Sequence, residues 1–192
     1  LIVDEAHHLE SATTDAMSFS LRALDVTRLI RELGNSEQGI LGRLVGMVGP
    51  ALMPSDLAAL LQTINAASER AFRFDTGMTA FFKALDFLLE ELREGKPLGT
   101  YPQKTRLLPS TRTIPAWLDV ELAWEQAKND LDELLKILKM IRTSVQGVDG
   151  ISPEDAEDSL GTLARATQSL NEIGLKLEEL TMSPSEEQIY WV

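Results

Sequence analysis

Residues 117–145 read WLDVELAWEQAKNDLDELLKILKMIRTSV, and this stretch decides the fold class. Its apolar residues alternate spacings of three and four, which is the period of one buried helix face. The residues on that face are Trp117, Val120, Trp124, Ala127, Leu131, Leu134, Leu138, Ile141 and Val145. The pattern predicts one long helix with a continuous seam toward a core.

A second long helix is expected to follow a short turn. Ser152 is a good N-cap, Pro153 suits the first helical position, and Glu154 and Asp155 suit the first turn. The apolar stripe that follows is Ala156, Leu160, Leu163, Thr167, Leu170, Gly174 and Leu177. The segment 146–150 between the two helices is short and glycine-rich, which indicates a turn. An antiparallel helix hairpin is therefore predicted over 117–181.

The first half of the chain is also predicted to be helical. Apolar stripes define one helix over 57–74, opened by Pro54, and another over 78–92, with a break between them at Asp75-Thr76-Gly77. A shorter helix is expected from Asp25, acting as its cap, to the stop signal Gly34-Asn35. For the glycine-rich segment 39–53, a mobile connection and a loosely packed helix are both left open.

Short β-type runs interrupt this mainly all-α pattern. Residues 105–108 and 111–114 are expected to pair as a small hairpin across Pro109-Ser110, giving a β element near 104–114. Residues 1–3 and 189–192 look like strands at the two ends. Together with a start at Leu1 rather than Met, they predict a helical insertion (11–188) cut from a longer protein between a stem at 1–10 and a returning strand at 189–192.

Composition limits the function classes. The 192 residues are 44% apolar, enough for one buried core, and no uncharged apolar run approaches the roughly 18 residues of a membrane span. A net charge of −12 opposes general adhesion to nucleic acid or anionic lipid, so any contact with phosphate must be local. The absence of cysteine excludes disulfides and thiolate metal sites within this span.

The sharpest chemical signal is the opening, Leu1-Ile2-Val3-Asp4-Glu5-Ala6-His7. An apolar strand that ends in two carboxylates is typical of nucleoside triphosphatases: Asp4 can hold the Mg²⁺ of the nucleotide, and Glu5 can orient the attacking water. His7 can relay between the nucleotide site and a neighbouring domain. The chain has no Gly-x-x-x-x-Gly-Lys-Ser/Thr phosphate loop, so by itself it is predicted to be inactive.

Asp4-Glu5-Ala6-His7 resembles the DEAH box, motif II, of superfamily 2 helicases, and the continuation to Glu10 resembles the DinG branch of the XPD-like DNA helicases. In that family a largely helical arch domain follows motif II. The resemblance therefore implies an arch-type insertion that helps to enclose single-stranded DNA, in a parent enzyme that hydrolyses ATP with Mg²⁺. It also implies forked DNA and the parent's own motor domains as partners, no membrane, DNA repair as the process, and a cytoplasmic, nucleoid-associated location in a bacterium. The family's iron–sulfur cluster, where present, precedes motif II and would lie outside these residues.

A second candidate site lies in residues 95–118, which hold four cations and no acid. The rest of the chain has a net charge of −16. Cations attract phosphate and aromatic faces stack on unpaired bases, so contact with single-stranded DNA is predicted here. The candidate residues are Lys96, Tyr101, Lys104, Arg106 and Arg112. A solubilising charge on a proline-rich loop is the structural alternative, and Trp117 is expected to be buried because it begins the helix seam.

Two alternatives to the DNA helicase remain. The first is a helical protein-interaction module whose hairpin surface binds a protein partner without contacting nucleic acid. The second is the arch of an RNA helicase, because RNA helicases share motif II. The acidic cluster at 154–158 is interpreted as the favourable first turn of a helix rather than as a metal site.

Overall fold

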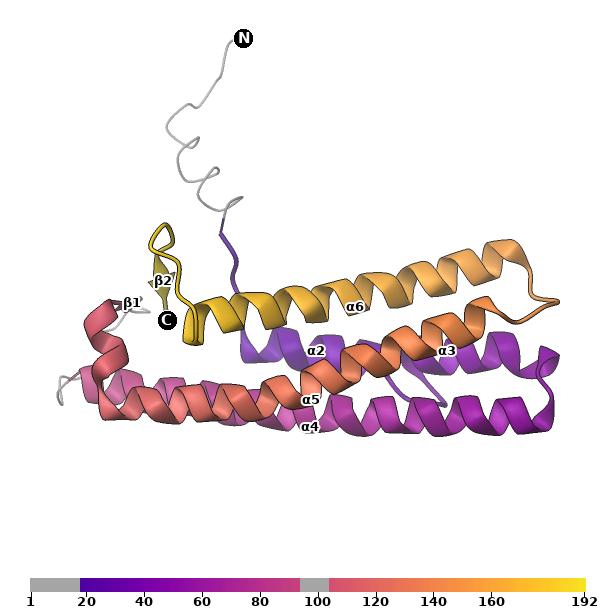
Figure 1. Cartoon of the computed structure of the whole chain (residues 1–192), viewed down its shortest axis with the longest axis horizontal. Coiled ribbons are helices and arrows are strands. Elements are labelled where there is room, and N and C mark those ends of the chain that lie inside the picture. Colours follow the sequence, from indigo (N-terminus) through magenta and orange to yellow (C-terminus); the bar gives the residue numbers. More distant parts are fainter. Residues whose placement is uncertain (1–17, 94–103) are drawn as a thin grey trace, which may run out of the picture.

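The computed structural model describes residues 18–93 and 104–192 and is mainly helical, as the sequence predicts (Figure 1). Its elements in chain order are α2 (Ala23–Leu33), α3 (Gly39–Val48), the 3₁₀ turn η2 (Gly49–Ala51), α4 (Pro54–Leu92), β1 (Arg106–Leu107), the 3₁₀ turn η3 (Pro109–Thr113), α5 (Pro115–Gln146), α6 (Pro153–Thr181) and β2 (Tyr190–Trp191). The expected strand at 1–3 lies outside the described residues.

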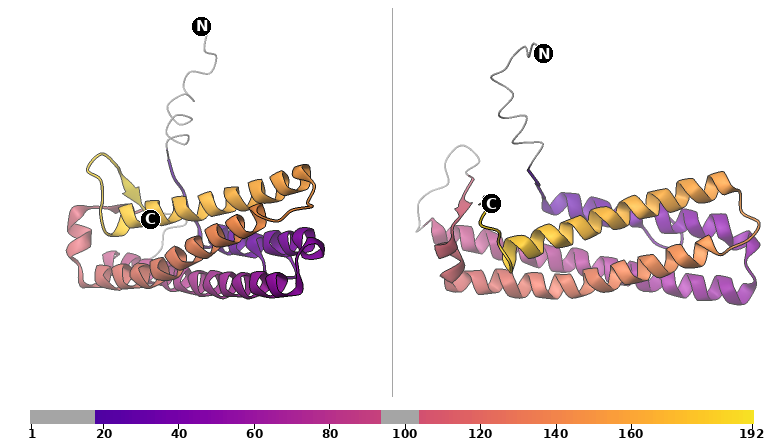
Figure 2. Two further views of the ribbon diagram at one scale, coloured as in Figure 1. Left: turned by 45° about the vertical axis from the view of Figure 1, so that its right-hand side comes forward. Right: turned by 45° about the horizontal axis from the view of Figure 1, so that its top comes forward.

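The helices form an elongated bundle with four helical positions. α4 and α5 are antiparallel, because Phe81 packs against Trp124 whereas Arg70, earlier in α4, reaches Asp130, later in α5. α6 then returns along α5 and confirms the predicted hairpin. α2 and α3 share the fourth position, where they contact both α4 and α6 (Figures 1 and 2).

The core follows the predicted seam closely. Every residue predicted on the α5 seam is buried, from Trp117 at 1% exposure to Val145 at 2%. On α6 the predicted Leu163, Leu170 and Leu177 are buried, but Ala166 and Ile173 are buried in preference to the neighbouring Thr167 and Gly174. Burial of apolar area along these facing seams is the main force that holds the helices together.

The predicted break at Asp75-Thr76-Gly77 is wrong, because α4 runs through it without interruption. The hydroxyls of Thr76 and Thr79 donate to the carbonyls of Phe72 and Asp75, four residues back within the helix. A Cβ on Gly77 would lie only 3.0 Å from the Cβ of Ala127. This glycine therefore serves the close approach of α4 to α5 and does not end a helix.

The predicted hairpin between 105–108 and 111–114 is also wrong. β1 pairs antiparallel with β2, with Arg106 opposite Trp191 and Leu107 opposite Tyr190. Residues 109–113 form a 3₁₀ turn instead, in which Thr111 accepts a hydrogen bond from the backbone N–H of Leu108 at 3.2 Å. Proline at the first position of this turn favours a helical turn over a second strand.

For the segment 39–53 the sequence allows either a mobile connection or a loosely packed helix, and the structure shows a packed helix. Ile40, Leu41, Leu44 and Val48 of α3 are buried. The preceding helix, α2, begins at Ala23 and not at Asp25, whose carboxylate accepts a hydrogen bond from the backbone N–H of Arg22 at 2.9 Å. Gly34 ends α2 as predicted, with a φ of 74° that a glycine adopts easily.

The C-terminal residues and β1 lie at one end of the bundle, while the α3–α4 and α5–α6 connections lie at the other end (Figures 1 and 2). We call the first of these ends the ribbon end, after the two-stranded ribbon β1–β2. The segment before α2 joins the bundle part-way along its length and leaves it on the same side as the ribbon. None of the helices in the described residues is long and apolar enough to cross a membrane.

Candidate nucleic-acid interface

The predicted site residues divide into two groups. Asp4, Glu5 and His7 of the DEAH-like motif lie outside the described residues, as do Lys96 and Tyr101 of the cationic segment. Lys104, Arg106 and Arg112 are described, and all three lie at the ribbon end. The geometry of a candidate site is therefore built on these three.

The ribbon is held by backbone pairing. The N–H of Thr105 donates to the carbonyl of Val192 at 2.7 Å, and the N–H of Val192 donates to the carbonyl of Thr105 at 2.9 Å. Successive side chains of a strand point to opposite faces. Leu107 is accordingly buried and Tyr190 half-buried on the inner face, while Arg106 and Trp191 are exposed on the outer face.

Arg112 connects the inner face of the ribbon to the helical bundle. Its guanidinium lies 4.7 Å from the centre of the Trp117 ring and 5.5 Å from that of Tyr190. It also donates hydrogen bonds to the carbonyls of Leu180 and Thr181 in the last turn of α6. These carbonyls lack partners within the helix and carry partial negative charge, so a cation is favourable there.

The electrostatics of Arg112 fit this internal role. Partial burial lowers the pKa of its guanidinium, while Tyr190 and Glu121 act in the opposite direction. An arginine remains charged after such a shift because its ordinary pKa is above 12. The donors of Arg112 are thus used within the chain, and among the described residues of this segment Lys104 and Arg106 are the cations that remain for a ligand.

Further contacts fix the parts around Arg112. The indole N–H of the buried Trp117 donates to Glu121 at 2.9 Å, so Trp117 belongs to the core as predicted. The hydroxyl of Tyr190 accepts a hydrogen bond from the backbone N–H of Ser185 at 3.0 Å and ties the connection after α6 to the ribbon. The backbone of Trp191 is therefore held on both sides.

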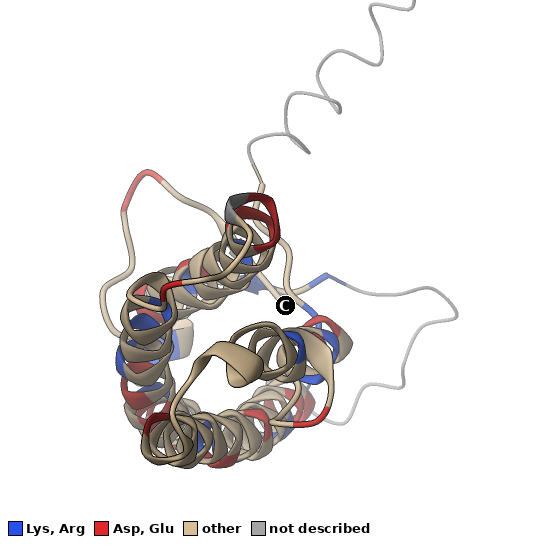
Figure 3. Ribbon diagram, turned by 90° about the vertical axis from the view of Figure 1, so that its right-hand side faces the viewer, with Lys and Arg blue, Asp and Glu red and all other residues tan. Residues whose placement is uncertain are grey.

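The outer face carries the groups that suit nucleic acid. Lys104 and Arg106 are exposed, and within residues 18–93 and 104–192 their side chains form no hydrogen bond or ion pair. Trp191 is 54% exposed, in contrast to Trp117 and Trp124, which are at 1% and 0%. Figure 3 shows cationic segments beside the C-terminus, at the margin of a bundle on which both signs are mixed.

The sequence pattern does not assign Trp191 to this site. Its signal is the aromatic pair Tyr190-Trp191 in a short polar connection, and this pair by itself predicts only a returning strand. Its place beside Arg106 depends on pairing between segments distant in the sequence, and no local pattern shows that pairing.

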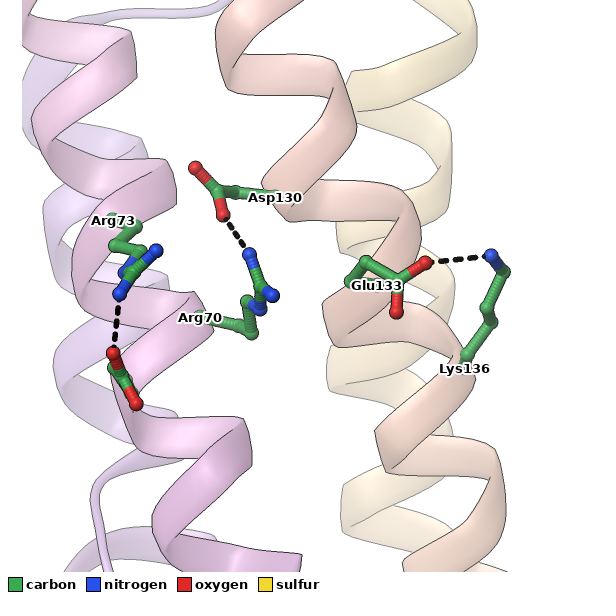
Figure 4. Close-up of polar contacts among 6 residues, drawn as sticks. Arg70, Arg73, Asp130, Glu133 and Lys136 are labelled. Atoms are coloured by element: carbon green, nitrogen blue, oxygen red, sulfur yellow. Dashed lines mark hydrogen bonds and ion pairs between the residues drawn. The ribbon is translucent and has the colours of Figure 1, made fainter.

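On the flanks of the bundle, several cations are paired with acids. Arg70 of α4 bonds Asp130 of α5 at 2.7 Å, and this hydrogen bond raises the pKa of Arg70 (Figure 4). Lys136 bonds Glu133 at 2.7 Å and lowers the pKa of that carboxyl. Within the described parts of the chain, no three His, Cys, Asp or Glu side chains are grouped as a metal site would require.

Comparison of the sequence with protein-family models and with curated proteins, and of the structure with solved structures, finds no significant match. The resemblance to helicases therefore rests on the residues from Leu1 to Glu10.

Proposed function

We propose that this chain is part of an ATP-dependent DNA helicase of the DinG/XPD type, with the helical bundle as an arch-like insertion that guides single-stranded DNA. The observation that carries the proposal is the run Leu1-Ile2-Val3-Asp4-Glu5-Ala6-His7, in which three apolar residues are followed by the DEAH sequence. In the parent enzyme Asp4 would hold the Mg²⁺ of ATP and Glu5 would orient the attacking water.

The fold supports this proposal in two ways. An insertion must leave and rejoin its parent domain at neighbouring points, and the segment before α2 leaves the bundle on the same side as the C-terminus (Figures 1 and 2). The exposed cations Lys104 and Arg106 lie beside that C-terminus, where an inserted domain would face the motor. DNA that leaves the motor would meet these cations.

A protein-interaction module is the second candidate, and a specific observation favours it. Large apolar side chains are exposed on the outside of α4 and α5, with Phe72 at 70%, Phe87 at 69% and Leu118 at 57%. With a net charge of −12, such a surface would suit a protein partner better than nucleic acid. The arch of an RNA helicase would differ from the first proposal only in substrate.

The coding sequence on both sides of this chain gives the first test. The proposal expects a Gly-Lys-Ser/Thr phosphate loop before Leu1 and a second motor domain after Val192. A flanking sequence without either would exclude the helicase and favour the interaction module.

The second test is ATP hydrolysis by the whole encoded protein. Glu5→Gln should lower the DNA-stimulated rate by about 10²–10⁴-fold, because it removes the group that activates water. Glu37→Gln is the matched control, since Glu37 is an exposed acid in the turn before α3. Equal rates for Glu5→Gln and the control would show that Glu5 has no catalytic role.

A further inference from the structure

We propose that the outer face of the ribbon, formed by Lys104, Arg106 and Trp191, binds single-stranded DNA, with Trp191 stacked on an unpaired base and the two cations on neighbouring phosphates. The inference rests on the proposed function for the class of ligand and names the residues that make the contact. It adds an aromatic group to a site for which the sequence indicated cations.

Trp191 is exposed although it is a large aromatic residue. An indole is a large apolar surface that a folded chain normally buries, and the chain buries its other two indoles almost completely. The backbone at Trp191 is ordered by the paired Thr105 and Val192 and, through Tyr190, by Arg112. A ring on an ordered backbone loses little conformational freedom when a base stacks on it, which favours binding.

The register of the ribbon brings Arg106 close to Trp191. Thr105 and Val192 exchange both backbone hydrogen bonds, so the next pair, Arg106 and Trp191, is of the non-hydrogen-bonded kind. In such pairs the two side chains lie closest together, with Cα atoms about 4.5 Å apart. Lys104, two residues before Arg106, falls on the same face by the alternation of a strand. Two cations thus accompany the ring on one surface.

The residues around the ribbon carry a local excess of positive charge. Residues 104–118 carry Lys104, Arg106 and Arg112 and no acid, and Arg112 is engaged internally. Glu186 and Glu187 are exposed on the connection before β2, so the local positive charge does not extend from the ribbon onto that connection. Two phosphate contacts on a single strand predict a slope of about −1.4 for the logarithm of affinity against the logarithm of salt concentration.

The ligand should be single-stranded rather than duplex DNA. An indole can stack only on a base whose face is open, and in a duplex both faces of each internal base are covered by neighbouring pairs. The ribbon presents one ring and two cations, and their contacts are too few to offset the free energy of separating base pairs.

The experiment measures binding of the 192-residue chain to fluorescein-labelled oligodeoxythymidylate by anisotropy. Trp191→Ala should weaken binding by roughly 5- to 150-fold, the usual range for one stacked base. Trp191→Phe should retain most of the affinity, because a phenyl ring also stacks. Phe72→Ala, which removes an aromatic ring on α4 that is more exposed than Trp191, should leave affinity unchanged.

Tryptophan fluorescence gives an independent readout. Because Trp117 and Trp124 are buried, quenching by acrylamide reports on Trp191, and bound oligonucleotide should protect it. Unaltered thermal unfolding of each variant would show that the fold is retained.

Binding that is unchanged in Trp191→Ala would overturn the stacking contact and leave the helicase proposal intact. Absence of any binding by the wild-type chain would overturn the ribbon site as a whole. The helicase proposal is decided separately, by the flanking sequence and by the effect of Glu5→Gln on ATP hydrolysis. Equal affinity for duplex and single-stranded DNA would also contradict the inference.

Discussion

The guanidinium of Arg112 lies 4.7 Å from the centre of the Trp117 ring and joins three parts of the chain that are distant in sequence. Through Trp117 it contacts the start of α5, through the carbonyls of Leu180 and Thr181 it caps α6, and through Tyr190 it holds β2. The strands β1 and β2 are only two residues long each, extended by the Thr105–Val192 pair, and such a short ribbon is not stable by itself in water. Its position therefore depends on this arginine.

Arg112→Ala is expected to destabilise the chain by about 1–3 kcal/mol, because it leaves partly buried carbonyls without a donor and removes two cation–π contacts. Arg112→Lys should recover only part of this loss, since an ammonium cannot reproduce the planar fork. Urea unfolding measures the free energy of both variants. Hydrogen exchange at the amides of Thr105 and Val192 should accelerate more than exchange in the middle of α5.

Arg142→Ala is the control for this substitution, because Arg142 is exposed on α5. It should change stability by less than about 0.5 kcal/mol. Ribbon amides that exchange equally fast in the wild-type chain and in Arg112→Ala would show that Arg112 does not hold the ribbon.

Glu178 should make stability depend on pH. Its carboxylate accepts a hydrogen bond from the indole N–H of Trp124 at 2.8 Å and pairs with Lys128 at 3.0 Å. Burial acts to raise the pKa of Glu178, but the bonds from Trp124 and Lys128 outweigh it, so the pKa is lowered. A lowered folded-state pKa stabilises the fold above the unfolded value of about 4.3, and the contribution is lost as pH falls through the folded value.

Glu178→Gln is expected to lower stability at neutral pH by about 1–2 kcal/mol and to have a smaller effect in acid, where the wild-type carboxyl is also neutral. The amide oxygen can still accept from Trp124, so the variant isolates the charge. Chemical unfolding at several pH values measures the difference, with Glu172→Gln, an exposed acid on α6, as the control. If Glu178→Gln lowers the free energy of unfolding equally at neutral and acidic pH, the charge of Glu178 does not stabilise the fold.

Gly77 and Gly46 should respond in opposite ways to substitution. A Cβ at Gly77 would lie 3.0 Å from the Cβ of Ala127 and 3.1 Å from its Cα, whereas a Cβ at Gly46 of α3 would meet nothing within 4 Å. Gly77→Leu should destabilise by about 1–3 kcal/mol through overpacking, although leucine favours a helix. Gly46→Ala should stabilise by up to about 1 kcal/mol. Thermal or urea unfolding compares the two, and a stabilised Gly77→Leu would show that α4 and α5 can separate without cost.

Local periodicity was enough to predict the helices, because each burial pattern lies within one segment. The α5 seam repeats every three or four residues from Trp117 to Val145, and every member is buried. The role of Gly77 could not be predicted in the same way. Whether a glycine ends a helix or allows a close approach depends on what faces it, and Ala127 lies on a different helix.

The candidate site was predictable in its charge but not in its shape. Lys104 and Arg106 stand out as cations in a segment without acids. The pairing of Arg106 with Trp191, and the use of Arg112 inside the fold, arise from tertiary contacts with the C-terminal residues. The sequence does not distinguish Arg112 from Arg106. In the structure Arg112 is bonded within the fold, whereas Arg106 is exposed.

Reversing the ribbon charges should weaken binding of single-stranded DNA and flatten its salt dependence. Each phosphate contact that is lost removes about 0.7 from the slope of log affinity against log salt, so Lys104→Glu with Arg106→Glu should bring a slope of about −1.4 close to zero. Anisotropy titrations of labelled oligodeoxythymidylate over a range of salt concentrations measure the slope.

The matched control is Lys83→Glu with Arg142→Glu, which changes the net charge equally but on exposed positions of α4 and α5. If binding depends on the ribbon, the control should keep the wild-type slope and lose affinity only slightly through the general increase in negative charge. Equal losses in the two double variants would mean that DNA responds to the net charge of the chain. The ribbon would then be a structural connection, and the exposed apolar side chains of α4 and α5 would become the better candidates for a partner surface.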